Sequence, residues 1–387
     1  MSTGFLNVVR RELRRLTSRP IYLVGMVMVP VVMAFFFIGM LNPGLPLKVP
    51  AGVVDLDHSQ MSRRLTRSLD AMELIDVVEA PMDYHEAMEA VQSGRIMGFF
   101  MIPENFEKDA VGGRGPQLTY YFNLSIYVPG SLMFKGFKTM GVTAAGGLVQ
   151  TNLVEKGAPE ALAGVVLQPL TVNSHPLHNP WLNYSYYLSP SFLYGVLELM
   201  IFLLTAFSIT QEIKTGTSLQ WLATAHGRIG TALLGKLLPQ TVIFTILGWG
   251  MNSLLFHWNH FPMNGNEWWM VIGMPLFVIA SQSFAATICA ILPNPRLALS
   301  ICSLVGILAF SLAAFSFPVE AMYGAMAIFS YILPVRWYFL IYGDIALDGW
   351  TVYYARMYFV ALLVFPMVAT LAAPLMRRAL RKPVYVP

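Results

Sequence analysis

The sequence predicts an α-helical polytopic membrane protein with six transmembrane helices and an α/β extracytoplasmic domain inserted between the first and second spans. Three observations carry this prediction. The 387 residues are 56% hydrophobic and only 12% charged, which is far more apolar than a soluble domain. Apolar runs of about 20 residues, the length that crosses a bilayer, recur along the chain. Residues 43–183 interrupt them with the composition of a soluble domain.

The distribution of charge predicts the orientation. Residues 43–183 carry 10 Lys and Arg against 14 Asp and Glu, whereas most other basic residues fall in four short segments, at 10–19, 214–236, 296 and 377–382. Because Lys and Arg concentrate in short cytoplasmic segments, we expect both termini in the cytoplasm and the acidic block outside. The basic residues form no single face, so the net charge of +4 does not indicate nucleic-acid binding.

The N-terminal region predicts an interfacial helix followed by a span. Residues 1–19 place Phe5, Val9, Leu13 and Leu16 on one side and arginines on the other, which is typical of an amphipathic helix along the inner membrane surface. The apolar run 20–42 follows. A basic start before an apolar run also describes a secretory signal peptide, but no small-x-small cleavage site follows. We therefore interpret it as an uncleaved first span.

Residues 43–183 alternate between strand and helix patterns, which favours a small α/β domain. A long helical stretch and a proline-rich return to the bilayer complete it. The expected strands are 49–54, 75–79, 96–102 and 117–122, the expected helices are 60–72 and 84–93, the long stretch is 127–155 and the return is 168–183.

Residues 184–387 contain the other five spans. Tyr and Trp residues beside them mark an outer interface. A shorter apolar piece that ends at Pro334 is typical of a re-entrant helix, so we expect segment 318–351 to dip in from the outer face. The expected spans are 187–208, 231–255, 268–292, 297–317 and 352–376.

A polar loop at residues 209–230 separates two of these spans, and it continues into the third span as QEIKTGTSLQWLATAHGRIGTALLGKLLPQ. This stretch resembles the signature of ABC-2 type transporter permeases, in which an acidic-basic pair leads into Gly-Thr, an amphipathic stretch and a later Gly-Lys. The segment FPVEAMYGAMAIFSYILPVRWYFLIYGDIALDGW resembles the family's outer re-entrant region. One departure is Ala225, where many members carry proline.

The resemblance implies a permease half of an ATP-driven exporter in a bacterial inner membrane. Its expected partners are an ABC ATP-binding subunit, a second copy or related permease, membrane lipids and a periplasmic adaptor that meets the outer domain. ATP and magnesium are expected in the partner ATPase, and no cofactor in this chain. Residues 230–237 nearly match a phosphate-binding loop, but Leu237 replaces the required Ser or Thr and no strand precedes it. Neither a catalytic constellation nor a metal site is predicted.

The polar loop is expected to couple the permease to the ATPase. By resemblance, residues 217–224 form a short helix in a groove of that subunit, with the apolar anchors Trp221 and Leu222. Its flanking residues would contact the ATPase or fix the bend after the second span. The alternative is a solvated loop whose tryptophan sits among lipid headgroups. The expected coupling residues are Glu212, Lys214, Gly216, Thr217, Trp221 and Leu222.

Three polar residues are candidates for a substrate pathway. Glu198 lies near the middle of the second span, where a carboxylate is costly and should face a cavity or a partner. A structural hydrogen bond inside the bundle is the equal alternative. Arg336 is a possible partner for Glu198 or for lipid phosphate, and Gln282 either lines the path or packs helices.

The predicted function is export of a hydrophobic or amphipathic substrate, drug-like or lipid-like. A passive channel or secondary transporter is the alternative, although neither an internal repeat nor a matched pair of interrupted helices is visible. A membrane-anchored sensor or scaffold that uses its outer domain is a second alternative.

Overall fold

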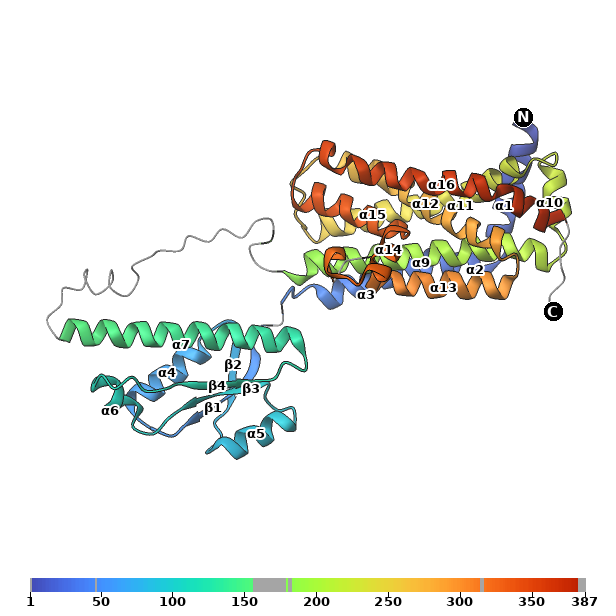
Figure 1. Ribbon diagram of the computed structural model, residues 1–387. Helices are drawn as coiled ribbons and strands as arrows, with labels where there is room; N and C mark the ends of the chain where they lie inside the picture. Colours follow the sequence, from blue (N-terminus) through green and yellow to red (C-terminus); the bar gives the residue numbers. More distant parts are fainter. Residues whose placement is uncertain (1, 46, 156–178, 180–182, 314–316, 382–387) are drawn as a thin grey trace. The chain divides into compact units, whose positions relative to one another are not determined.

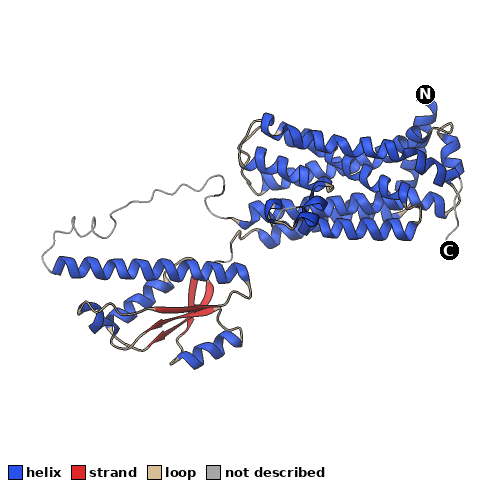
Figure 2. Ribbon diagram, in the orientation of Figure 1, coloured by secondary structure: helices blue, strands red, loops and turns tan. Residues whose placement is uncertain are grey.

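The computed structural model describes all residues except 1, 46, 156–178, 180–182, 314–316 and 382–387. The chain forms two compact units: a helical unit of residues 1–44 and 176–387, and an α/β unit of residues 45–175. Figure 2 shows the strands of the described chain gathered in the α/β unit. Most of the predicted return at 168–183 lies outside the described residues.

Six helices in the described part of the chain are long and apolar enough to cross a membrane, judged by length and composition. This number agrees with the six spans predicted from the sequence. They are α2–η1–α3 (Pro20–Leu23, Val24–Met28, Val29–Leu41), α9 (Tyr184–Lys214), α11–η2 (Ile229–Ser253, Leu254–Trp258), α12 (Trp268–Ile291), α13 (Pro295–Leu312) and α16 (Val352–Arg381).

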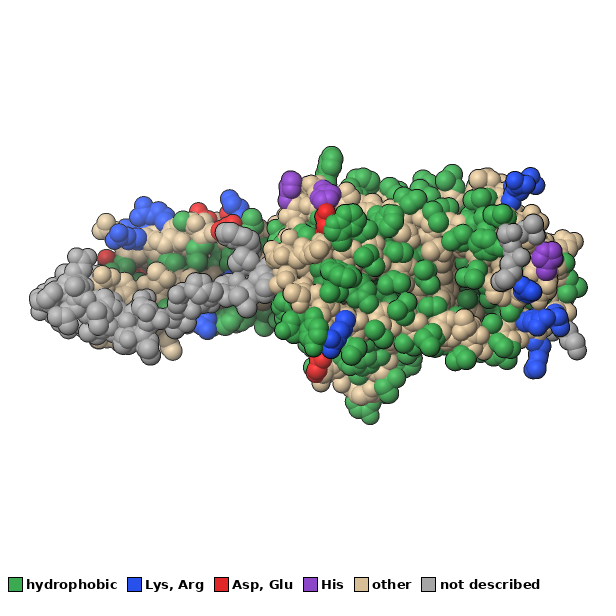
Figure 3. All heavy atoms as spheres, turned by 90° about the horizontal axis from the view of Figure 1, so that it is seen from above, with side chains coloured by type: hydrophobic (Ala, Val, Ile, Leu, Met, Phe, Trp, Pro, Cys, Tyr) green, Lys and Arg blue, Asp and Glu red, His purple; other side chains and the backbone are tan. Residues whose placement is uncertain are grey.

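The helical unit is organised around α9. This helix is the most buried of the six candidate spans and packs against α3, α12 and α13, while α12 packs against α16 (Figure 1). Helix α16 exposes aliphatic side chains such as Val360, Leu363 and Met367. Figure 3 shows hydrophobic side chains over most of the visible face of this unit. An apolar outer surface is what a lipid environment requires.

One end of the helical unit, which we term the basic end, holds α1 (Ser2–Ser18), α10 (Ser218–Thr224) and the last turns of α16 (Figure 1). Helix α10 contacts α1, α9, α11 and α16. Lys and Arg side chains gather at this end in Figure 3.

Helix α9 continues six residues beyond the predicted end of the second span at residue 208. The first part of the predicted coupling loop, residues 209–214, is therefore helical. Polar side chains signalled a helix end, but they find partners here: the Thr210 hydroxyl donates to the Ala206 carbonyl at 2.7 Å. Helix α13 ends at Leu312, and residues 314–316 of the predicted fifth span lie outside the described residues.

The predicted re-entrant segment contains a sharp bend. Helix α14 (Gly324–Tyr331) and the pair α15–η4 (Pro334–Ile341, Tyr342–Leu347) meet at 77°, after the short helix η3 (Val319–Ala321). Pro334 has no N–H and forces Leu333 into extended geometry, with φ −96° and ψ 118°. This geometry suits a broken span or a re-entrant loop, and entry from the outer face stays a prediction.

The α/β unit is built on a four-stranded sheet of order β2-β1-β3-β4. Strand β1 is parallel to β2 and β3, and β4 is antiparallel to β3. The predicted strands and helices are present with small shifts at their ends. The elements are β1 (Val49–Asp55), α4 (Gln60–Asp70), β2 (Ile75–Glu79), α5 (Tyr84–Gln92), β3 (Gly98–Ile102), α6 (Phe106–Val111), β4 (Thr119–Phe122) and α7 (Tyr127–Glu155).

Successive strand residues point to opposite faces of this sheet. Phe100 packs with Leu65 of α4 and Phe137 of α7, whereas the adjacent Phe99 packs with Ala87 and Ala90 of α5. Helices α4 and α5 therefore cover opposite faces.

Candidate functional site: a buried charge cluster at the basic end

A tight turn joins α9 to α10 at the basic end. Gly216 has φ +69°, a backbone conformation that L side chains rarely adopt and that commonly ends helices. The N–H of Thr217 donates to the Glu212 carbonyl at 2.9 Å across this turn. The Gly-Thr pair of the sequence motif thus reverses the chain so that α10 can begin at Ser218.

Five charged side chains converge beneath this turn, and we term them the Glu212 cluster: Arg11, Glu12, Arg15, Glu212 and Lys236. Arg11 holds Glu212 with two hydrogen bonds of 2.8 Å, one to each carboxylate oxygen. The Lys236 ammonium lies 2.9 Å from Glu212 Oε1 and 2.8 Å from Glu12 Oε2. Arg15 also pairs with Glu212. The cluster therefore ties α1, α9 and α11 together.

The centre of the Glu212 cluster is closed to solvent. Glu12, Glu212 and Lys236 are each 0% exposed, whereas Arg11 and Arg15 are partly exposed. Burial lowers the pKa of Arg11, but its hydrogen bond to Glu212 and the nearby carboxylates outweigh burial and hold that pKa above its usual value. Buried charges persist only when paired, so the cluster fixes how these helices meet.

Two of the predicted coupling residues, Thr217 just before α10 and Trp221 within it, contact the Glu212 cluster. The Thr217 hydroxyl donates to Glu212 Oε2, and the Lys236 ammonium lies 4.9 Å from the centre of the Trp221 ring, within the range of a cation–π interaction. The predicted coupling residues Thr217 and Trp221 therefore contact Glu212 and Lys236 directly.

Trp221 and Leu222 do not project outward as the predicted anchors. Trp221 is 0% exposed and Leu222 is 5% exposed, and both pack with Val8 and Ile209 inside the chain. The amphipathic pattern of α10 predicts an apolar side turned toward a partner, but this chain itself covers that side. The outward face instead carries Leu219, which is 55% exposed, with Gln220 and Ala223.

The buried side of helix α1 differs from the predicted apolar side, while its placement along the membrane surface stays a prediction. Its buried side holds Val8, Glu12 and Leu16, while Leu13 is 48% exposed. Val8 fits against Gly235 of α11, where a Cβ atom would lie 2.9 Å from it. The ion pairs turn charged side chains of α1 toward α9 and α11. Helix α1 is therefore held to the other helices by charged as well as apolar contacts.

Two further sequence features are located at this end. Lys214 is exposed at the last residue of α9. Residues 230–237, the near match to a phosphate-binding loop, lie within helix α11, where Lys236 belongs to the Glu212 cluster. A helical backbone does not present the ring of N–H groups that such a loop uses.

A comparison with protein-family models decides the family. The model described as ABC-2 family transporter protein matches residues 20–373. The chain belongs to the ABC-2 transporter family. It is thus a membrane component of an ABC transporter, whose ATP-binding partner is a separate subunit. A search of curated proteins finds no match.

Glu198 of this permease caps the bent segment. Its side chain is 0% exposed, and Oε1 accepts a 2.8 Å hydrogen bond from the N–H of Val335, in the first turn of α15. The partner of Glu198 is therefore this backbone N–H and not Arg336. Carboxylates are favourable at helix N-termini because the first N–H groups have no partner within the helix.

The capping contact predicts different outcomes for two substitutions. Glu198→Gln keeps an oxygen for the Val335 N–H, whereas Glu198→Ala leaves that buried donor unpaired, at a cost of about 1–3 kcal/mol. We expect the alanine variant to unfold at lower denaturant concentration in detergent than the glutamine variant. Equal loss of transport in both variants at unchanged stability would contradict a purely capping role.

The other two pathway candidates are held in helix packing. Gln282 is 2% exposed and accepts a 2.7 Å hydrogen bond from the Thr241 hydroxyl, which joins α12 to α11. Arg336 is 8% exposed, donates to the Ala313 carbonyl at 3.4 Å and lies over the Tyr331 and Trp337 rings. A role for either in a substrate path stays a prediction.

Most partners of Glu212 are not among the residues predicted from the sequence. Two signals point to them: Glu12 is the only acid among the basic residues of α1, and Lys236 is the only charge within α11. An isolated charge in an apolar or oppositely charged setting indicates a partner elsewhere in the fold.

Proposed function

We propose that this ABC-2 permease subunit exports a hydrophobic or amphipathic substrate, and that force from the ATPase enters through the outward face of α10. The observation that carries this proposal is the division of α10 into two sides. Trp221 and Leu222 join the helix to the bundle, and Leu219 is left for a partner. An exposed apolar side chain on a short helix suits a groove in another subunit.

The Glu212 cluster supports the same proposal. Helix α10 contacts α1, α9, α11 and α16, and Glu212 and Lys236 connect three of these helices by ion pairs. A push on α10 would move these helices as a group. ATP can drive export in this way only if the ATPase binds two arrangements of the group with different affinity.

We place the basic end in the cytoplasm, with the α/β unit outside, because Lys and Arg gather at this end. The ATPase then meets α10 from the cytoplasm. The α/β unit would cap the exit or contact a periplasmic adaptor, and a second copy or related permease would complete the pathway. Membership of an ABC family supports ATP-driven transport over a passive channel.

The outward face of α10 can be tested with Leu219→Asp. If Leu219 is a central contact, its loss should cost about 2 kcal/mol or more, which is roughly 30-fold in affinity. We expect the variant to fold normally but to retain much less ATP-binding subunit on co-purification, and to lose ATP-driven transport.

Pro293→Asp provides the matched control. Pro293 is an exposed loop residue between α12 and α13, so this change introduces the same carboxylate outside α10. The control should bind the ATPase as the parent does. Full ATPase binding by Leu219→Asp would remove α10 from the proposed interface.

A further inference from the structure

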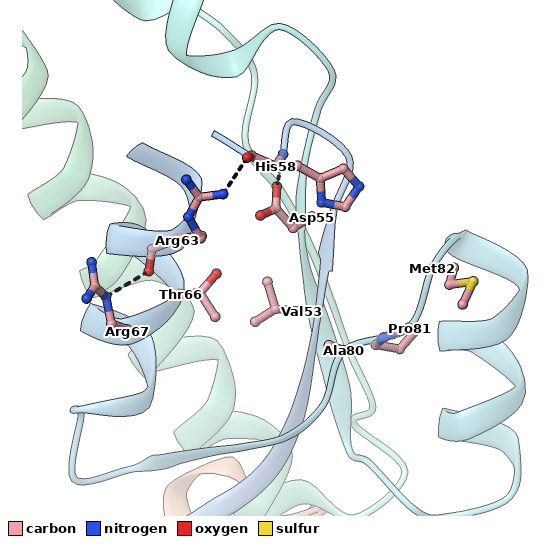
Figure 4. Close-up of a pocket in the computed structure, with 9 residues that line it drawn as sticks. All are labelled: Val53, Asp55, His58, Arg63, Thr66, Arg67, Ala80, Pro81 and Met82. Carbon is pink, nitrogen blue, oxygen red and sulfur yellow. Dashed lines mark hydrogen bonds between the residues drawn. The ribbon is translucent and has the colours of Figure 1, made fainter. Parts of the chain in front are cut away.

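The α/β unit contains a cavity of about 700 Å³ beside the carboxyl end of β1 (Figure 4). Three segments form it: the end of β1 and the following loop, with Asp55 and His58, the helix α4 with Arg63 and Arg67, and the β2–α5 loop with Pro81. Helix α10, the Glu212 cluster and the transmembrane helices contribute nothing to it, so its chemistry is separate from the proposed coupling.

Sheet topology explains the position of this cavity. Strands β1 and β2 are parallel neighbours, but the chain leaves β1 toward α4 on one face and leaves β2 toward α5 on the other. The two loops therefore diverge and leave a crevice at the carboxyl ends of the strands. In open α/β sheets, ligands usually bind in a crevice outside the carboxyl ends of the strands.

Basic side chains border the cavity, although the acidic block that contains it carries more acids than bases. His58, Arg63 and Arg67 are all exposed there. Arg63 donates one hydrogen bond to the His58 carbonyl, at 2.6 Å, and Arg67 donates one to the Arg63 carbonyl, at 3.3 Å. A guanidinium has five N–H donors, so each arginine keeps donors for an acceptor in the cavity.

The one acid that lines the cavity is occupied by its own loop. Asp55 Oδ1 accepts from the N–H groups of Asp57 and His58 at 3.1 and 3.0 Å, and Oδ2 accepts from the Ser62 hydroxyl at 2.6 Å. Asp55 therefore shapes the β1–α4 loop and leaves the arginines for a ligand. The N-terminus of α4, capped by Ser59, adds a favourable field for negative charge.

We propose that this cavity binds a small organic anion. Its acidic group, a carboxylate or a phosphate, would contact Arg63 and Arg67, since arginine suits both acids. Its apolar body would lie against Val53, Ala80 and Pro81 on the lining. The cavity is within the range of small-molecule sites.

Ligand-observed ¹⁹F NMR on the full-length protein in lipid nanodiscs tests the proposal. The probes are 4-fluorophenyl phosphate and 4-fluorobenzoate, with 4-fluorobenzyltrimethylammonium as the cationic counterpart. We expect at least one anion to bind and the cation not to bind. The stronger of the two anions identifies the acidic group.

Two variants locate the binding. Arg63→Gln/Arg67→Gln should lower the affinity for the anion by roughly tenfold or more, since the double substitution removes charged hydrogen bonds. Arg64→Gln/Arg114→Gln removes the same charge from the same unit and should bind as the parent does, because neither residue lines this cavity. Ala80→Trp replaces an exposed side chain and should fill the cavity and abolish binding.

Several outcomes would overturn the proposal. Equal anion affinity in the two double variants would show that Arg63 and Arg67 do not contact the ligand. Binding of the cation as strongly as the anions would exclude an anion site, and absence of binding by both anions would do the same. Unchanged affinity in Ala80→Trp would place the anion outside the cavity.

Discussion

Replacing Glu212 with alanine is expected to destabilise the helical unit by about 3–5 kcal/mol, the cost of breaking a buried ion pair from one side. Lys236 would keep only Glu12, and Arg11 would lose both of its hydrogen bonds to Glu212. Denaturant titration of the purified permease in detergent measures this loss. The same variant should uncouple ATP hydrolysis from transport, because α1, α9 and α11 lose their common partner.

A double-mutant cycle with Lys236→Met separates the pairing from general damage. Methionine keeps much of the apolar stem of Lys236 and removes its charge. If the two groups stabilise each other, the double variant should lose less unfolding free energy than the two single variants lose together. The difference should be about 0.5–3 kcal/mol, the usual coupling between contacting residues. Strict additivity would contradict the direct pairing seen at 2.9 Å.

Trp221→Ala is expected to cost about 3–5 kcal/mol of stability, the usual range for removing a large buried aromatic side chain. The indole is 0% exposed and contributes the ring beneath the Lys236 ammonium. We therefore expect this variant to lose ATPase association through misplacement of α10 and not through a missing surface contact. Denaturant titration and co-purification should report both losses together.

Leu219→Ala is the control on the same helix. Because Leu219 is 55% exposed, its truncation should change stability by less than about 0.5 kcal/mol while it weakens ATPase binding. If Trp221→Ala leaves stability unchanged and Leu219→Ala lowers it, the two sides of α10 are assigned the wrong way round.

Much of the fold could be predicted because its signals are local. Apolar length located the six spans, and alternation located the four strands. The stop at Pro334 also follows from local chemistry, since proline restricts Leu333 before it. The end of α9 could not be predicted in this way, because the partners of Glu212 lie elsewhere in the chain: Arg11 about 200 positions earlier and Lys236 in α11.

The sequence predicted which segment forms the candidate site but not how its side chains are arranged. The motif identified Glu212 and the Gly216 turn, but the pattern of α10 could not tell whether Trp221 faces a partner or its own chain. Both environments select an apolar aromatic residue. Only the packing of α1 against α11, permitted by Gly235, shows that this protein covers that face itself.

The junction of the inserted segment has a consequence for how this architecture can vary. The N–H of Tyr184 donates to the Gly44 carbonyl at 3.1 Å. The chain therefore leaves the helical unit and returns to it at adjacent positions. Segments with adjacent ends behave as cassettes, because a host can exchange or shorten them without rearranging its own core. Replacement of residues 45–183 by a short turn should therefore leave the fold of the six helices intact. The inserted segment can then vary in sequence without changing α10, the proposed contact with the ATPase.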